Sequence, residues 1–170
     1  NAGTPPIIYD PVLIENSRMQ MEKAMNNKGY MAARVDVDTV SKGKRMDVFY
    51  RVSANTPHYI DDIDYRISND TISRLVERQY ASHSLLKKGS NFDRNVLDEE
   101  RQRISDMLRR DGFYAFNKEL ITYTADTADR SKAVDLTMNL VPESVANASG
   151  YRPYERYYMR KIYFVLSYDP

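Results

Sequence analysis

The sequence contains no cysteine and no tryptophan, and it has no long apolar run. The absence of cysteine excludes disulfide bonds and thiolate chemistry, although this composition fits cytosolic and periplasmic proteins alike. A membrane-spanning helix needs roughly 18 consecutive apolar residues, and no segment approaches that length. Any membrane attachment is therefore expected to lie outside these residues.

An excess of charge of one sign is also missing. The 25 Lys and Arg residues are balanced by 24 Asp and Glu residues, which leaves a net charge of +1. Proteins that bind nucleic acids usually carry surplus positive charge because they neutralise phosphates. The balance argues against a nucleic-acid partner, and a cytosolic αβ nucleic-acid-binding repeat is kept only as the alternative function.

Few residues are suited to catalysis or metal binding. His58 and His83 are the only histidines, and neither has a partner at metal-ligand spacing. Asp36, Asp38 and Asp47 invite a calcium interpretation, but the segment lacks the glycine and the closing glutamate of a calcium loop. No nucleophile–base pair or phosphate loop is visible. We therefore expect a protein that is not an enzyme, with no catalytic residue, no metal site and no cofactor.

The most informative feature that is present is an internal repeat with a constant spacing of 83 residues. Similar residues recur at this spacing on one helical face and at both ends of the same predicted helix. The matched pairs are Tyr9 with Phe92, Asp10 with Asp93, Ile14 with Leu97, Met21 with Ile104, Met25 with Leu108, Gly29 with Gly112, and Tyr30 with Phe113. These matches predict core packing for Met21 and Met25 rather than a binding patch, and they indicate a modular protein.

Each copy begins and ends its helix with the same chemistry. Asp10 and Asp93 suit the N-cap, where a side-chain oxygen accepts hydrogen bonds from free amides. Gly29 and Gly112 suit the left-handed residue that ends a helix. The acidic run at 98–100 lies in the first turns of the second helix, and we interpret it as a favourable interaction with the helix dipole.

A strand pair is predicted after each glycine, because apolar residues alternate on both sides of a polar turn. The predicted segments are 30–39, 41–44 and 46–52 in the first copy, and 114–123, 125–132 and 134–140 in the second. A strand at 59–67 and a helix that starts at Asn69-Asp70 precede the second copy. One whole unit is therefore strand, helix, helix, strand, strand.

The repeat predicts a division of the chain into modules. Residues 158–166 resemble the strand at 59–67 at a spacing of 99 residues. We expect a complete module flanked by two partial ones. The segments are a remnant of tag cleavage at 1–3, a final helix and hairpin at 4–56, a complete module at 57–142, a linker at 143–156, and the first strand of a following module at 157–170.

This order of elements, with a glycine and an aromatic residue after each helix, resembles the POTRA domain. The residues that carry the resemblance are Asp10, Gly29, Tyr30, Gly89, Phe92, Asp93, Gly112 and Phe113. It covers nearly all of the chain and is nearest to the surface-antigen type of the BamA and TamA outer-membrane assembly proteins. The connection at 141–156 departs from the pattern because it is longer than the usual link. The resemblance implies an α+β fold in which two helices cover one face of a three-stranded mixed sheet.

The resemblance also implies a location and a function. POTRA domains stand in tandem on the periplasmic side of the bacterial outer membrane. The implied partners are unfolded outer-membrane protein clients, assembly partner proteins and a C-terminal membrane barrel of the same parent chain, with no nucleic acid among them. In this fold the third strand is central and the second lies at an edge, where an extended client can add a strand. The expected edges are 32–39 and 116–123, with Val35, Val37, Thr39, Leu120 and Thr122 as candidate binding residues.

Overall fold

The structure is a computed structural model that describes residues 8–127, 132–146 and 152–165. The chain divides into two compact units. The first contains residues up to Ile63 together with Leu86–Val96 and Ala125–Leu136, and the second contains Asp64–Leu85, Leu97–Thr124 and the segment from Thr137 onward. Residues 1–3 and 166–170 lie outside the described residues, and the predicted module boundaries stay predictions.

In the first unit, helix α1 spans Pro11–Asn27 and begins as the sequence predicts. The Asp10 carboxylate accepts a hydrogen bond from the Val12 amide at 2.8 Å, and Pro11 lies in the first turn. No residue of α1 is fully buried, and Met21 and Met25 are half-buried. Met21 and Met25 are therefore only partly buried, whereas the sequence predicted that they pack in the core.

Strands β1 (Arg34–Lys42) and β2 (Arg45–Ser53) form the predicted hairpin. The register pairs Lys42 with Arg45 across a two-residue turn, in which Gly43 adopts a φ of 65°. Strand β1 begins later than residue 30, because the Ala33 amide donates to the Tyr30 carbonyl at 3.0 Å and closes a turn there.

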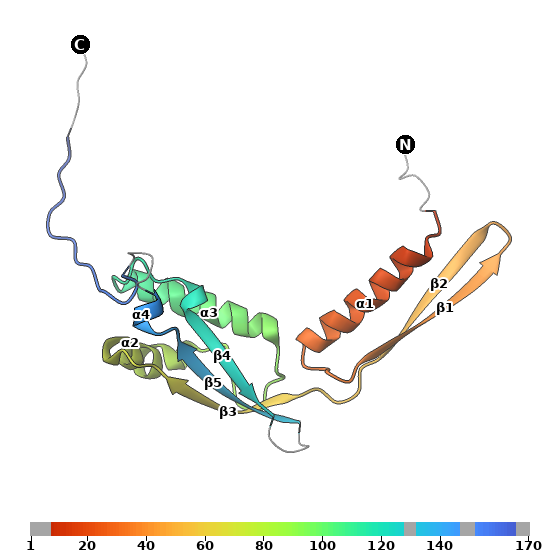
Figure 1. Cartoon of the computed structure of the whole chain (residues 1–170), viewed down its shortest axis with the longest axis horizontal. Coiled ribbons are helices and arrows are strands. Elements are labelled where there is room, and N and C mark those ends of the chain that lie inside the picture. Colours follow the sequence, from red (N-terminus) through yellow and green to blue (C-terminus); the bar gives the residue numbers. More distant parts are fainter. Residues whose placement is uncertain (1–7, 128–131, 147–151, 166–170) are drawn as a thin grey trace, which may run out of the picture. The chain divides into compact units, whose positions relative to one another are not determined.

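Strands β3 (Tyr59–Arg66), β4 (Ile121–Asp126) and β5 (Ala133–Leu140) form a three-stranded mixed sheet in the order β3-β5-β4. Strands β3 and β5 run in the same direction and β4 runs opposite to them (Figure 1). The last of the three strands is therefore central and the second lies at an edge, as the resemblance implied.

Strand β4 starts later than predicted. Residues Lys118–Leu120 form the 3₁₀ helix η3, and the Asn117 side chain accepts a hydrogen bond from the Glu119 amide at 3.0 Å. This local bond holds the chain in a turn where the apolar alternation suggested a strand. The predicted strand over 114–123 is therefore wrong before Ile121, and Leu120 is not part of a strand.

Two helical segments cover one face of this sheet. The first comprises α2 (Asp70–Arg74), the π-helix η1 (Leu75–Tyr80) and the 3₁₀ helix η2 (Ala81–His83), and the second is α3 (Arg94–Arg110). Helix and strand residues meet in one core cluster of the second unit, which contains Ile72, Val76, Ile104, Leu108, Phe113, Phe116, Leu120, Ile121, Met138 and Tyr154. The predicted α+β fold with two helices on one sheet face is confirmed.

Both long helices end with the same hydrogen-bonded motif. The amide of Tyr30 donates to the Met25 carbonyl, and the amide of Phe113 donates to the Leu108 carbonyl, each at 3.0 Å. These bonds are typical of a Schellman motif, which needs a left-handed residue before the aromatic one. Gly29 and Gly112 have φ values of 90° and 97°, so the predicted helix stops are confirmed.

The last described segment has little regular structure. Helix α4 is short and spans Glu143–Ala146 within the predicted linker. None of the described residues from 152 to 165 lies in a strand. The strand that was predicted from residue 157 onward is therefore not formed in the part of it that the structure describes.

Candidate functional site

The outer edge of β3 is covered over its first half by the loop at Gly89–Phe92. The Ile60 amide donates to the Ser90 carbonyl at 2.9 Å, and the Gly89 amide donates to the Ile60 carbonyl at 2.7 Å. The Phe92 amide donates to the His58 carbonyl at 2.9 Å, and Gly89 has a φ of 81°. The Gly-x-x-Phe pattern therefore blocks strand addition at the start of β3.

Strand β4 forms the opposite edge of the sheet. The Val141 amide donates to the Leu120 carbonyl at 2.9 Å, which fixes the backbone of residue 120 toward β5. Backbone groups of successive strand residues point to alternate sides, so Thr122 also faces β5. The outward groups at this edge are therefore those of Ile121, Tyr123 and Ala125.

Strand β1 has one strand neighbour among the described residues, which is β2. The two-residue turn makes Lys42 and Arg45 a hydrogen-bonded pair, and every second residue of β1 then faces β2. Val35, Val37, Thr39 and Ser41 consequently direct their backbone groups away from β2. The Val35 amide donates a hydrogen bond to the Glu22 side chain of α1, which agrees with an outward direction of the Val35 backbone.

The predicted edge residues fall into two groups. Val35, Val37 and Thr39 lie on β1 with outward backbone groups, and Val37 and Thr39 remain candidates for strand addition. Leu120 is buried in the core cluster, and Thr122 faces β5 through its backbone. We therefore correct the candidate residues of the second edge to Tyr123 and Ala125.

A side chain of α1 occupies the first outward group of β1. The Glu22 carboxylate accepts a hydrogen bond from the Val35 amide at 3.0 Å. The Arg18 guanidinium holds the same carboxylate oxygen at 2.9 Å and also pairs with Glu15. The Val35 bond, together with Arg18, lowers the pKa of Glu22 and keeps it ionised at neutral pH.

A side chain of α3 occupies the first outward groups of β4 in the same way. The Arg101 Nε donates to the Ile121 carbonyl at 2.8 Å and to the Lys118 carbonyl at 3.1 Å. The same guanidinium pairs with Asp98 and Glu119 at 3.1 and 2.9 Å. The sequence analysis did not identify Glu22 or Arg101 as edge residues. One signal was available, because Arg101 matches Arg18, the partner of Glu22, at the repeat spacing of 83 residues.

Glu100 corrects the interpretation of the acidic run in α3. Its side chain is only 2% exposed. It accepts hydrogen bonds from the Ser84 hydroxyl at 2.9 Å and the Leu85 amide at 3.0 Å, and Arg103 binds it with two donors at 2.7 Å. Glu100 therefore connects the loop after η2 to α3 through hydrogen bonds. The predicted interaction with the helix dipole does not account for this role.

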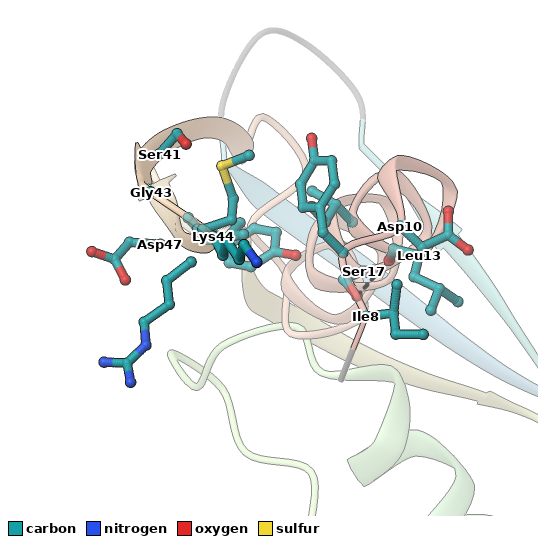
Figure 2. Close-up of a pocket in the computed structure, with 14 residues that line it drawn as sticks. Ile8, Asp10, Leu13, Ser17, Ser41, Gly43, Lys44 and Asp47 are labelled. Carbon is teal, nitrogen blue, oxygen red and sulfur yellow. Dashed lines mark hydrogen bonds between the residues drawn. The ribbon is translucent and has the colours of Figure 1, made fainter. Parts of the chain in front are cut away.

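A groove of about 790 Å³ lies in the first unit beside α1 and the hairpin. Asp10, Leu13 and Ser17 of α1 and its cap, together with Ser41 and Lys44 of the hairpin, line it (Figure 2). Its further apolar lining comes from Ile8, Ile14, Met46, Val48 and Tyr50. This groove is the second surface of the first unit that is suited to an extended apolar segment.

Within the described residues there is no cluster of three or more acidic or histidine side chains that could hold a metal ion. The His58 ring contacts the Gly29 carbonyl at 3.2 Å, and the His83 ring contacts the Ser82 hydroxyl at 2.9 Å. His58 and Gly29 are 29 residues apart and His83 and Ser82 are neighbours, and we interpret both contacts as structural. None of the described helices is long and apolar enough to cross a membrane.

Comparisons with known proteins place this fold. No family model matches the sequence, and no curated protein matches it significantly. Among solved structures the chain is similar to POTRA domains 3–5 of BamA from Haemophilus influenzae, with a TM-score of 0.50 and 15% identity over 80% of this chain and 52% of that one. BamA from Haemophilus ducreyi lacking POTRA domains 1–3 gives a TM-score of 0.44 with 16% identity, over 82% of this chain and 24% of that one. POTRA domains 1–3 of the periplasmic domain of Omp85 from Anabaena give a TM-score of 0.38 with 18% identity, over 88% of this chain and 65% of that one.

The likeness to the Haemophilus influenzae structure shows the fold. The chain has the POTRA fold, which confirms the class that the Gly-aromatic helix ends indicated. The chain spans about half the length of that structure.

Proposed function

We propose that this chain is a periplasmic segment of an outer-membrane protein assembly factor, which is not an enzyme and which receives extended β-rich client chains by strand addition at β1 and β4. The observation that carries the proposal is the pair of sheet edges. Among the described residues, no strand pairs with the outward side of β1 or of β4. The outward residues Val37, Thr39, Tyr123 and Ala125 offer backbone groups that an extended chain can bind without close reading of its side chains.

The affinity of one such edge is expected to be low. Each net hydrogen bond contributes about 0.5–1.5 kcal/mol, whereas ordering each client residue costs about 1–2 kcal/mol of backbone entropy. The two terms nearly cancel over a short strand, so we expect binding at a single edge to be weak and transient. Weak binding suits a protein that must pass its clients onward.

A repeated backbone contact supports a tandem arrangement of modules. The His58 amide donates to the Gly29 carbonyl, and the Tyr157 amide donates to the Gly112 carbonyl, each at 2.9 Å. His58 and Tyr157 match at the same spacing of 99 residues that relates the strand at 59–67 to residues 158–166. The same contact therefore follows each helix-ending glycine, as expected where one module leads into the next.

Cysteine cross-linking to a model strand tests the proposal, because the chain has no cysteine of its own. The probe is a peptide of about ten alternating apolar and polar residues, a strand length typical of outer-membrane proteins, with one central cysteine. Thr39→Cys and Ala125→Cys place a thiol on each open edge. Glu99→Cys, on the exposed side of α3, is the matched control. We expect disulfides with the peptide at both edges and little reaction at Glu99→Cys.

A second peptide of the same composition with a proline in its centre cannot complete a strand ladder, and it is expected to react poorly at both edges. Equal reaction at all three positions, or equal reaction of the two peptides, would show that the thiols report on chance encounters. Either result in a chain with an unchanged circular dichroism spectrum contradicts strand addition.

A further inference from the structure

We infer that Glu22 and Arg101 determine where an added strand can begin on β1 and β4, by occupying the first outward backbone groups of these strands. The inference rests on the proposed strand addition. It assigns these two helix side chains a positioning role at the edges, beyond any contribution to the stability of the helices.

At β1, a carboxylate satisfies a backbone donor. The Val35 amide points away from β2 and donates to Glu22 Oε1 at 3.0 Å. Arg18 Nη1 holds this oxygen at 2.9 Å, so the carboxylate is anchored on α1. An added strand would have to displace a charge-assisted hydrogen bond to pair with Val35. Among the described residues, no side chain binds the Val37 or Thr39 amide in this way.

At β4, a guanidinium satisfies a backbone acceptor. The Ile121 carbonyl accepts from Arg101 Nε at 2.8 Å, and the Ile121 amide donates to the Lys118 carbonyl. Both outward groups of Ile121 are therefore engaged. Arg101 is held by Asp98 and Glu119, and Lys118 Nζ donates to Asp98 at 2.7 Å.

The two arrangements occupy the same place in the repeat. Val35 pairs with Val52 in β2, and the bond between Val141 and Leu120 sets Ile121 opposite Leu140 in β5. Val52 and Leu140 are counterparts in the last strands of the two copies. The chemistry of each side chain also suits the backbone group that it binds. The Glu22 carboxylate is an acceptor for the Val35 amide, and the Arg101 guanidinium is a donor to the Ile121 carbonyl. Pairing therefore starts at Val37 on β1 and at Tyr123 on β4.

Amide hydrogen exchange of the full chain, followed by NMR, tests the inference at Val35. Glu22→Ala removes the acceptor, whereas Glu22→Gln keeps an acceptor oxygen and is the matched control. Without peptide, the Val35 amide should exchange about ten- to a hundredfold faster in Glu22→Ala than in the wild type, the factor that one net hydrogen bond to a charged group is worth. Glu22→Gln should remain close to the wild type.

The alternating peptide, used without its cysteine, then reports where pairing starts. In the wild type it should protect the Val37 and Thr39 amides and leave Val35 unchanged. In Glu22→Ala, protection should extend to Val35. For β4, Arg101→Met should shift the carbonyl ¹³C resonance of Ile121, and the peptide should move it back toward the wild-type value.

The outcomes separate the inference from the proposed function. If the peptide protects Val35 as well as Val37 in the wild type, strand addition stands and the positioning role is wrong. The role is also wrong if Glu22→Ala leaves Val35 exchange unchanged, or if protection does not extend to Val35 in that variant. If no β1 amide responds to the peptide in any variant, strand addition at β1 is overturned and the positioning role of Glu22 falls with it.

Discussion

At the scale of single residues, Glu100 is the buried charge whose contribution to stability the structure defines best. Burial alone would raise the pKa of Glu100, but the hydrogen bonds from Arg103, the Leu85 amide and the Ser84 hydroxyl outweigh burial and lower it. A group whose pKa is lower in the folded state stabilises the fold above its unfolded pKa. That contribution is lost as the pH falls through the lowered folded value.

Glu100→Gln is therefore expected to destabilise the chain by about 1–3 kcal/mol at neutral pH, since it removes a charge that several donors need. The difference from the wild type should shrink as the pH falls below the ordinary glutamate value of 4.5. Urea denaturation at pH 7 and at pH values below 4 measures it. Glu15→Gln, which alters an exposed pair with Arg18 on α1, is the control and should change stability little at either pH. A difference for Glu100→Gln that does not depend on pH would contradict the assignment.

The glycines give a second prediction at this scale. A Cβ atom at Gly29 would lie 2.6 Å from the Phe92 carbonyl oxygen, whereas a Cβ atom at Gly89 would meet nothing within 4 Å. Both residues have positive φ, so either alanine substitution costs about 1–2 kcal/mol for the left-handed backbone. Gly29→Ala should cost clearly more than Gly89→Ala, because only Gly29 also forces a backbone clash. Thermal unfolding of the two variants compares them, and equal losses would rule out the close approach.

Sequence reasoning succeeded where a residue acts through its neighbours in the chain. The N-cap at Asp10 and the left-handed stops at Gly29 and Gly112 depend on bonds within a few residues, and all three were predictable. The role of Glu100 was not, because its partners Ser84 and Leu85 lie in a loop some 15 residues away. Only the fold brings that loop to α3.

At the scale of elements, backbone groups alternate between inward and outward directions along a strand, and this alternation is the phase of the strand. The phase decides with which residues an added strand can form hydrogen bonds. The phase of β1 was predictable from the alternation of Val35 and Val37 with aspartates, although the turn comprises only Gly43-Lys44 and not the predicted residues 41–44. The phase of β4 was not, because the Asn117 turn replaces the expected start of the strand with η3. A shift of one residue exchanges outward and inward backbone groups, so the candidate edge residue on β4 is Tyr123 and not the predicted Thr122.

Adjacent proline substitutions on β1 test this phase. Thr39→Pro removes an outward amide and should weaken binding of the alternating peptide while costing little stability. Val40→Pro removes an amide of the pair with Asp47 and should destabilise the hairpin by about 1–3 kcal/mol, the cost of leaving the partner carbonyl unpaired. Urea denaturation and peptide titration of both variants provide the comparison. If Thr39→Pro were the more destabilising, the outward residues of β1 would be those of the opposite phase.

At the scale of the whole molecule, the balance of charge separates the proposed function from a nucleic-acid-binding repeat. Binding to phosphates strengthens as salt is removed, because it depends on the release of counterions. With a net charge of +1, the chain should show no binding to a single-stranded RNA oligonucleotide by fluorescence anisotropy, even at low salt. Tight binding with a steep dependence on salt would favour the alternative function.

The surfaces of the molecule also offer two places for an extended apolar chain, the strand edges and the groove beside α1. The groove exposes side chains such as Met46, which is 37% exposed, whereas its counterpart Val134 in the second copy is buried. Binding in the groove would depend on the apolar residues of a client, whereas binding at the edges depends on its backbone. The location of a bound peptide therefore separates the two surfaces directly.

Intermolecular nuclear Overhauser contacts between the full chain and the alternating peptide measure that location. Strand addition predicts contacts from backbone protons of the peptide to those of Val37 and Thr39 on β1, and of Tyr123 and Ala125 on β4, in the alternating pattern of a paired strand. Contacts confined to Leu13, Met46 and the rest of the groove, with no backbone contact at either edge, would contradict the central claim.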